Sequence, residues 1–461
     1  MKTLTILAVV AFLSACSHAP NYKLYEPPST PGFANRPDEA AQEEPAAEFW
    51  RGFQDAQLDA LVARALGANA DLRIAGANLR EARALAQFAE AQLLPAVDVA
   101  AGAGRVRAPD AAGNPRTNHA YAVGFDVNWE VDLFGRLGDE RRAAVADVTA
   151  SEAGLHFVHL SVSAEVARIY FELRGLQERL RVAYASLETR RSVLELVKAR
   201  HDAGRGTAFD AERARVLVQS AAASVPALEA AVLRARYRLS RLCGEQPTAL
   251  DVELSVPKPL PGLKSVALGG IGSPESLLRR RPDILAAEQQ AAAAAARVGV
   301  ARAELFPRIT LGGTIGQNAL TLGNLGDGAS YAYSLGARMV WNLLDFGRIR
   351  ARIAAADARG DAAMLVYERT VLTALEEAEG ALATYTRSQR QAEHLYDAAR
   401  AAESAALIAR ERFTAGVSDF LPVLDAEREM LSARDQLAQA QTAAATSLVG
   451  VYKALGGGWP S

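Results

Sequence analysis

Residues that could carry out catalysis or bind a metal are few and widely scattered in this sequence. The chain has six histidines and two cysteines, and His18, His119, His201 and His394 do not have the spacing of metal ligands. It contains no phosphate-binding loop, no glycine-rich dinucleotide motif after a strand, and no motif around a Ser, His and Asp set. We therefore predict no catalytic residue, no metal site, no cofactor and no enzymatic activity.

One cysteine, Cys16, lies where a covalent modification is expected. Lys2 and an apolar run over residues 4–13 have the organisation of a secretory signal, and the run is too short to span a bilayer. The tetrapeptide LSAC at 13–16 resembles a bacterial lipobox, which predicts removal of residues 1–15 and a lipid on Cys16. A soluble secreted protein with a chance cysteine is the alternative. Once Cys16 is lipidated, Cys243 has no cysteine partner for a disulfide.

Composition narrows the class of protein further. Half of the 461 residues are hydrophobic, which permits a large buried surface, and the net charge of -2 lacks the basic excess typical of nucleic-acid binding. Residues 16–50 carry six prolines, so we expect an extended tether that follows the lipid anchor.

The chain repeats itself at an offset of 212 residues, which predicts an internal duplication. Landmarks that match at this offset include Leu93 and Leu305, Pro95 and Pro307, Trp129 and Trp341, and Gly204 and Gly416. We expect a first repeat over 51–245 and a second over 273–461. The connector between them, 246–272, is rich in proline and glycine, which break helices.

Each repeat contains a stretch that alternates between apolar and polar side chains. Over 121–133 the odd positions are large and apolar, whereas Asp126, Asn128 and Glu130 lie at even positions; 331–343 repeats the pattern. This period of two is typical of strands with one apolar face. Weaker alternating stretches precede both, so we predict β-hairpins at 95–133 and 307–345, with loops near 107–118 and 320–328.

These hairpins could belong to a soluble protein or to a membrane barrel. The lipobox, the aromatic residues and strand lengths near the roughly 9 to 11 residues of a tilted span favour the membrane. Four strands cannot close a barrel alone, because about eight is the practical minimum and open edges cannot face hydrocarbon. The barrel must therefore be shared between chains.

Two proline-free stretches of about 67 residues predict helices far longer than a compact domain needs. They begin helical hairpins at 137–243 and 349–456 that turn at Gly204 and Gly416, where Thr207 or Ser418 can cap the returning helix. The second stretch has two apolar seams, one through Val371, Ala374 and Ala378, the other through Leu365, Leu372, Leu375 and Leu382. Two seams predict neighbours on both sides, as in a wall of helices, although a soluble coiled-coil rod is the alternative.

Together these landmarks resemble the TolC-like outer membrane factor family, in its NodT-type lipoprotein branch. The resemblance covers nearly the whole mature chain. The motifs that carry it, besides the lipobox, are WEVDLFG at 129–135, RRPDI at 280–284, LFP at 305–307, WNLLDFG at 341–347 and ALGGGW at 454–459.

The resemblance implies a mixed fold, with a transmembrane β-barrel and a long α-helical barrel closed as a homotrimer. It implies an outer-membrane lipoprotein whose helical tunnel lies in the periplasm. Its partners would be outer-membrane lipid, a periplasmic adaptor and an inner-membrane transporter, with no nucleic acid. The protein would be the passive exit duct of a tripartite efflux system. A stand-alone diffusion porin and a lipid-tethered coiled-coil scaffold are the alternatives.

The resemblance also implies a gate at the periplasmic tip of the second hairpin. Leu421 and Asp425 fall on the constriction positions, with Asp419 nearby, and Pro422 departs from the family pattern. Without the resemblance, Asp425 is an ordinary solvated charge and Asp419 a first-turn residue favoured by the helix dipole. The first-half tip around Phe209 and Asp210 is the other place for a constriction.

Overall fold

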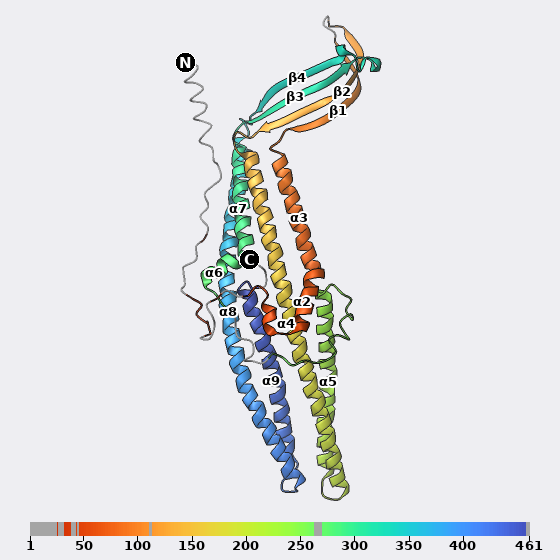
Figure 1. Cartoon of the computed structure of the whole chain (residues 1–461), viewed down its shortest axis with the longest axis vertical. Helices are drawn as coiled ribbons and strands as arrows, with labels where there is room; N and C mark the ends of the chain where they lie inside the picture. The colour runs from red at the N-terminus through yellow and green to blue at the C-terminus, as the bar shows by residue number, and fades with distance from the viewer. Residues whose placement is uncertain are drawn as a thin grey trace. The chain divides into compact units, whose positions relative to one another are not determined.

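The computed structural model describes residues 25, 32–37, 43, 46–109, 113–261 and 270–457 (Figure 1). Contacts divide the chain into two compact units. We call Ala77–Glu152 with Ala286–Arg369 the β unit, and Pro27–Gly76 with Ala153–Leu285 and Thr370–Ser461 the hairpin unit. The elements are, in chain order, η1 (Phe49–Phe53), α2 (Ala56–Ala68), α3 (Ala70–Ala91), β1 (Ala96–Pro109), β2 (Pro115–Val131), α4 (Arg136–Asp202), α5 (Ala208–Leu242), α6 (Pro274–Arg280), α7 (Pro282–Ala303), β3 (Arg308–Ala319), η2 (Leu322–Asn324), η3 (Gly328–Ser330), β4 (Tyr331–Val340), α8 (Phe346–Thr414) and α9 (Leu421–Ala454).

The β unit contains one antiparallel sheet with the strand order β1-β2-β3-β4. Its register places residues of like parity side by side across all four strands, since Val99 pairs with Phe125, Phe125 with Ile315, and Ile315 with Tyr333. Successive side chains of a strand point to opposite faces, so the apolar positions form one continuous face and the polar positions the other. Among the large side chains of the apolar face, Phe125, Ile315 and Tyr333 are exposed.

The first two strands are longer than the sequence pattern predicts. β1 has 14 residues and β2 has 17, so the turn between them is shorter than the expected loop over 107–118. The alternation stops near Tyr121, because beyond it Thr117, Asn118 and His119 are polar or small on both faces. Backbone pairing nevertheless continues to Pro109 and Pro115.

A compact corner connects β2 to α4. The Asp132 carboxylate accepts hydrogen bonds from the amides of Leu137 and Gly138, at 3.1 and 2.7 Å, which satisfies free N–H groups of the first helical turn. Glu130 and Arg136 form a bidentate ion pair with both N–O distances at 2.9 Å. These bonds fix the direction in which the chain leaves the sheet.

The hairpin unit consists mainly of two antiparallel helix pairs, one from α4 and α5 and the other from α8 and α9 (Figure 1). α4 has 67 residues and α8 has 69. Each pair turns just after a glycine with positive φ, Gly204 at 67° and Gly416 at 72°. Glycine adopts this conformation without a Cβ clash, which explains where the long helices end.

The two returning helices begin differently. Thr207 caps α5 in a capping box with Asp210, as the sequence predicts. The prediction that Ser418 caps α9 is wrong: Phe420 is the N-cap residue, and the buried Ser418 hydroxyl has no hydrogen-bond partner among the described residues. α9 starts only at Leu421, and Pro422 occupies its first turn, where a missing N–H group costs no hydrogen bond.

Part of the proline-rich tether is folded against the hairpin unit. The backbone amides of Ala34 and Asn35 donate to the two carboxylate oxygens of Glu379, at 2.7 and 3.1 Å, and Phe33 is buried. At its end, η1 places Phe49 in a stacked contact with Tyr452, with ring centroids 5.2 Å apart. These described residues of the expected tether therefore pack on α8 and α9.

Large side chains form the core of the hairpin unit where α2 meets α4. Leu58, Leu61 and Leu173 are fully buried, and the rings of Phe53 and Phe171 lie 4.7 Å apart. The seams expected on α8 differ from each other: Val371, Ala374 and Ala378 of the first are fully buried. In the second, Leu365 and Leu372 are 64% and 47% exposed, whereas Leu382 is fully buried. α5 is long and apolar enough to cross a membrane by length and composition alone, but its Val218, Ala221 and Val225 are buried in the hairpin unit.

Candidate functional site: the hairpin tips and the polar face of the sheet

The second hairpin tip presents the predicted gate residues on one exposed helix face. Leu421 is the first residue of α9 and Asp425 lies one turn later, and both are exposed, Leu421 at 47%. Asp425 has a cationic neighbour that the sequence reasoning did not consider, Arg428, at an N–O distance of 4.0 Å. An exposed pair of this length is weak, so Arg428 holds the Asp425 carboxylate only loosely.

Asp419 is not a first-turn residue. It precedes the N-cap Phe420 and lies in the exposed turn between the two helices. The expectation that the helix dipole holds it in the first turn is therefore wrong, and the cause is again the late start of α9. The structure leaves Asp419 beside Leu421 in sequence but outside the helix face that carries Leu421 and Asp425.

In the first hairpin tip, Phe209 and Asp210 have separate roles. Phe209 is 67% exposed, and the Arg213 guanidinium lies over its ring at 5.4 Å from the centroid. Asp210 accepts from the Thr207 hydroxyl at 2.6 Å and completes the cap of α5. This contact gives Asp210 a structural role, whereas Phe209 remains available for contacts outside the chain.

The two tips pack against each other through an apolar cluster, which we call the tip core. From the first hairpin it takes Leu187, Leu194, Val197, Ala214, Val218 and Ala221, and from the second Phe413, Phe420, Val423 and Leu424. Arg200 joins the hairpins as well, since its guanidinium lies 4.4 Å from the centroid of the Phe413 ring and donates to the Phe413 carbonyl at 3.3 Å. The exposed face of α9 that carries Leu421 and Asp425 thus lies opposite a face that is anchored in the tip core.

A buried charged group lies beside the tip core. Glu427 is 4% exposed and forms an ion pair with Arg410, and its second oxygen has no hydrogen-bond partner among the described residues. Glu427 lines a cavity of about 10 Å³ together with Arg190. Burial lowers the pKa of the Arg190 guanidinium, and Glu427 opposes that shift. Sequence reasoning missed this group because Glu427 looks like any other helix charge.

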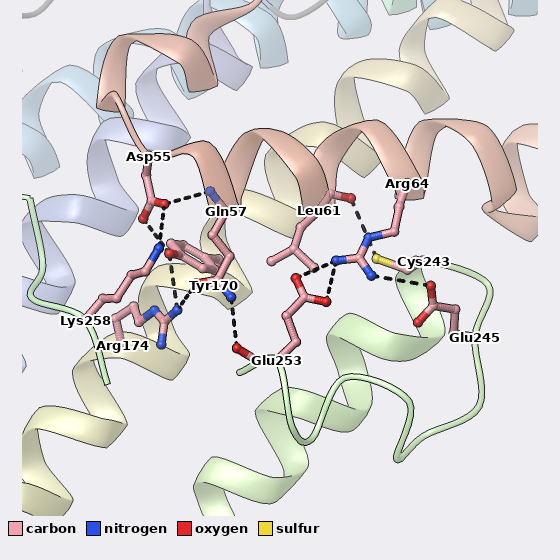
Figure 2. Close-up of polar contacts among 10 residues, drawn as sticks. All are labelled: Asp55, Gln57, Leu61, Arg64, Tyr170, Arg174, Cys243, Glu245, Glu253 and Lys258. Carbon is pink, nitrogen blue, oxygen red and sulfur yellow. Dashed lines mark hydrogen bonds and ion pairs between the residues drawn. The ribbon is translucent and has the colours of Figure 1, made fainter. Parts of the chain in front are cut away.

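Figure 2 shows two polar networks that hold the connector against α2 and α4. In the first, Asp55 accepts from the Gln57 amide at 2.9 Å and from the Tyr170 hydroxyl, while Lys258 lies 3.5 Å away. Arg174, 1% exposed, donates to the Gln57 side chain at 2.6 Å and to the Val256 carbonyl at 2.9 Å. Burial and the Asp55 contact raise the pKa of Tyr170, so the hydroxyl stays protonated as a donor.

In the second network, Arg64 bonds Glu253 at 2.7 Å and lies 3.7 Å from Glu245 (Figure 2). Cys243 lies beside them and contacts the Leu61 carbonyl at 3.7 Å. Burial raises the pKa of its thiol to about 11, so this cysteine is an unreactive packing residue. Neither network resembles a catalytic centre. Within the described part of the chain, no three His, Cys, Asp or Glu side chains are grouped so that they could hold a metal ion.

The polar face of the sheet is lined by small side chains. The row Ala100, Gly124, Gly316 and Ala332 crosses all four strands. A Cβ atom at Gly124 would lie 2.6 Å from the Ile315 carbonyl oxygen, so only glycine fits at this close approach of β2 and β3. The other polar-face residues include Asp98, Asp126, Asn128, Thr314 and Ser334.

Cys16 lies outside the described residues, so the lipid anchor stays a prediction.

Comparison with known proteins gives one consistent result. The outer membrane efflux protein family matches residues 61–245 and 273–457. The chain is 34% identical to the outer membrane protein OprJ of Pseudomonas aeruginosa, over 98% of this chain and 95% of that one. It is 33% identical to the pyoverdine export outer membrane protein OpmQ of the same species, over 100% and 98%.

Solved structures agree with these matches. The outer-membrane channel OprN superposes with a TM-score of 0.90 at 38% identity, covering 96% of this chain and all of that one. The open state of the Neisseria gonorrhoeae MtrE outer membrane channel gives a TM-score of 0.83 at 30% identity, covering 96% and 99%. The fold, long helical hairpins with a β domain, is that of these channels. The chain therefore belongs to the outer membrane efflux protein family, as its sequence motifs predict.

Proposed function

We propose that the protein is the exit duct of a tripartite efflux system, formed by three copies of this chain. The duct passively conducts small molecules that a periplasmic adaptor and an inner-membrane transporter deliver. The family consists of outer membrane efflux channels, which are not enzymes. The energy for export must therefore come from the transporter.

The observation that carries this proposal is the open sheet. Among the described strands, β1 and β4 are the two edges, and one face of the sheet exposes large apolar side chains such as Val99, Phe125, Tyr333 and Leu335. An apolar face of this kind suits hydrocarbon, but edges with unpaired backbone groups do not. Edge pairing between copies solves this problem, and three copies give a barrel of twelve strands.

Exposed apolar residues on the helices support the same assembly. Leu365 and Leu372 of α8, and Leu85 and Phe88 of α3, are 47% to 64% exposed. Such exposure is costly in water, because each large side chain gains about 1.5 to 3 kcal/mol when it is fully buried. Neighbouring copies that cover these residues would form a closed wall of helices.

Two equivalent contacts support a duplicated chain with repeats over 51–245 and 273–461. The indole of Trp129 donates to the Leu93 carbonyl at 2.9 Å, and that of Trp341 donates to the Leu305 carbonyl at 3.0 Å, 212 residues later. The two family matches also begin 212 residues apart, at 61 and 273. In this arrangement residues 246–272 connect the repeats.

We propose that residues 1–15 are removed and that a lipid on Cys16 anchors the duct to the outer membrane. Ser17 follows the cysteine and differs from the aspartate that retains lipoproteins in the inner membrane. Cells fed a labelled fatty acid should label the wild-type protein, and Cys16→Ala should abolish the labelling. Label at the N-terminus of the variant would contradict the lipobox.

Reconstitution tests the function against its alternatives. Purified protein should run as a trimer and should show a small, mostly closed conductance in planar bilayers, which rises when the cognate adaptor is added. A trimer that is fully open without a partner would favour a diffusion porin. A protein that never conducts would favour a lipid-tethered scaffold.

A further inference from the structure

The two β-hairpins of the sheet have the same register when residue numbers are shifted by 212. In the first hairpin Ala96 of β1 lies opposite Asn128 of β2, and in the second Arg308 of β3 lies opposite Val340 of β4. Every other pair of the second hairpin also matches a pair of the first after this shift. The hairpins are therefore structurally equivalent, and β1 corresponds to β3 as β2 corresponds to β4.

Within the described sheet, pairing between the two hairpins occurs once. β2 of the first hairpin pairs with β3 of the second, with Gly124 opposite Gly316, and we call this pairing the internal junction. The same shift turns the internal junction into a pairing of β4 with a strand equivalent to β1. Among the described strands, however, β1 and β4 are the two open edges of the sheet (Figure 1). The equivalent partner of β4 is therefore β1 of another copy.

Two glycines on the open edges match the glycines of the internal junction. Gly336 of β4 corresponds to Gly124, and Gly104 of β1 corresponds to Gly316. In the internal junction, a Cβ atom at Gly316 would clash with the carbonyl oxygen of Val123. The two backbones thus approach too closely for any residue except glycine at these positions.

Inside the single chain, Gly104 and Gly336 have no such constraint. A Cβ atom at either position would meet nothing within 4 Å among the described residues. Glycine weakens the interior of a strand, because it has no side chain to pack and loses more conformational freedom on folding than other residues. Close approach of another backbone explains glycine at both edge positions, as it does at Gly124 and Gly316.

The helices of the β unit show a matching difference in burial. Three alanines on one face of α4 are buried, Ala143, Ala146 and Ala150. The residues of α8 that follow them by 212 are exposed, Ala355, Ala358 and Ala362. This part of α4 contacts α7, since Asp147 forms an ion pair with Arg297. Because α3 corresponds to α7, the equivalent neighbour of α8 is α3 of another copy.

We propose that β4 pairs with β1 of a neighbouring copy in the register of the internal junction, with Gly336 opposite Gly104. The inference rests on the proposed function, in which three copies close one barrel. The same register places Ala337 opposite Ala103, as Phe125 lies opposite Ile315 within the chain.

A slip of two residues would also keep the apolar face continuous, because side chains alternate with a period of two. It would place Gly336 opposite Gly102, which is a glycine as well. The equivalence of the hairpins, rather than the alternation, therefore selects the register.

Disulfide cross-linking tests this register. Directly opposite residues of an antiparallel pair have Cβ atoms about 4.5 to 5.5 Å apart, whereas diagonal neighbours are about 7 to 8 Å apart, too far for a disulfide. Oxidised Ala103→Cys/Ala337→Cys protein should therefore give covalent dimers and trimers on a denaturing gel, and a reducing agent should remove them. β1 and β4 are separated by two strands in one chain, so these bands require contacts between copies.

The matched control is Ala101→Cys/Ala337→Cys, which tests the slipped register and should stay monomeric on the same gel. Wild-type protein should also stay monomeric, because its Cys243 is buried. Trimers of the Ala103 and Ala337 variant that do not cross-link, or cross-linking of the Ala101 and Ala337 variant instead, overturn the register and leave the proposed function intact.

Two alanine substitutions test the register without added cysteines. Gly104→Ala should reduce the yield of trimers, because its methyl group meets the backbone of the neighbouring copy, whereas Gly102→Ala should leave the yield unchanged. Both positions are open within the single chain, so an effect on folding of the monomer would be similar in both variants. An equal loss in both variants, or a greater loss with Gly102→Ala, contradicts the register. Wild-type protein that never forms trimers would contradict the proposed function itself, and this inference with it.

Discussion

Asp55 and Asp59 lie one turn apart at the start of α2, and their surroundings have opposite effects on their charge. Burial opposes ionisation of Asp55, but bonds from Tyr170 and Gln57 and the charge of Lys258 outweigh it, so its pKa is lowered from 3.8. Burial raises the pKa of Asp59 from the same value, and its Oδ1 atom has no hydrogen-bond partner among the described residues. Removing the charge of Asp55 and removing the charge of Asp59 should therefore have different effects on the stability of the protein.

We expect Asp55→Asn to destabilise the protein by about 1 kcal/mol at pH 7, because a charged acceptor is lost from a partly buried network. A carboxyl whose pKa is lowered by folding stabilises the fold above its unfolded pKa of 3.8 and loses this contribution as the pH falls through the folded value. The difference between wild type and variant should thus shrink toward pH 3. Thermal melting in detergent, followed by circular dichroism, measures it.

Asp59→Asn is the matched control and should be neutral or slightly stabilising at pH 7, since it removes a charge that burial disfavours. Equal destabilisation by both substitutions, or an Asp55 effect that does not change with pH, would contradict this assignment.

Some of these residue roles could be predicted from the sequence and others could not. Leu421 and Asp425 share a helix face because they are four residues apart, which spacing alone reveals. The network of Asp55, Tyr170 and Val256 could not be found this way, because its members come from segments more than 80 residues apart. Only the packing of α2 and the connector on α4 brings them together.

At the scale of elements, α4 offers two glycines in contrasting environments. A Cβ atom at Gly175 would lie 2.8 Å from the Cβ atom of Thr442 in α9, whereas one at Gly154 would meet nothing within 4 Å. Close packing of α4 on α9 thus requires glycine only at the first position.

We expect Gly175→Ala to cost about 1 to 3 kcal/mol through overpacking. Gly154→Ala should stabilise the same helix by up to about 1 kcal/mol, because alanine has the higher helix propensity. Melting temperatures of the two variants should lie on opposite sides of wild type. If Gly175→Ala melts at or above wild type, the contact between α4 and α9 is looser than described.

In the sheet, the neighbouring residues Val127 and Asn128 should respond differently to substitution by arginine. Val127 lies on the apolar face, paired with Val97 and Gly313, and Asn128 lies on the polar face, paired with Ala96 and Gly312. Arginine at Val127 should cost roughly 2 to 4 kcal/mol if it faces the bilayer midplane and should reduce assembled trimers in outer-membrane fractions. Arginine at Asn128 should assemble normally and alter conductance; equal assembly defects would contradict the barrel assignment.

Parity of the strands is visible in the sequence, but their length is not. The alternation shows which side chains lie on the apolar face, and these are the odd positions in all four strands. Beyond Tyr121 the pattern vanishes while the backbone ladder continues, because main-chain hydrogen bonds do not depend on side-chain type. The pairing of β2 with β3 also needs the fold, since these strands lie in different repeats.

At the scale of the whole molecule, the proposed trimer accounts for features that the single chain does not explain. In it, neighbouring copies would pair with the open sheet edges and cover the exposed leucines of α8. The sequence indicates this from counting alone, because four alternating strands cannot close a barrel. What it does not indicate is the arrangement at the tips, where Arg428 lies beside Asp425 and the tip core anchors the opposite face of α9.

That arrangement leads to the prediction for gating. In a trimer, three copies of Leu421 and Asp425 would surround one axis and combine an apolar seal with a ring of carboxylates, only weakly offset by Arg428. Replacing both with serine should raise the conductance of the isolated trimer and make cells permeable to vancomycin without a transporter. The tip core lies on the buried face of α9, so trimers should remain intact on gels.

As a control, Asp210→Ser removes a carboxylate from the first tip, where it caps α5, and should lower stability slightly without opening the duct. If instead the Leu421 and Asp425 variant keeps the wild-type conductance while Phe209→Ser raises it, the constriction lies at the first tip.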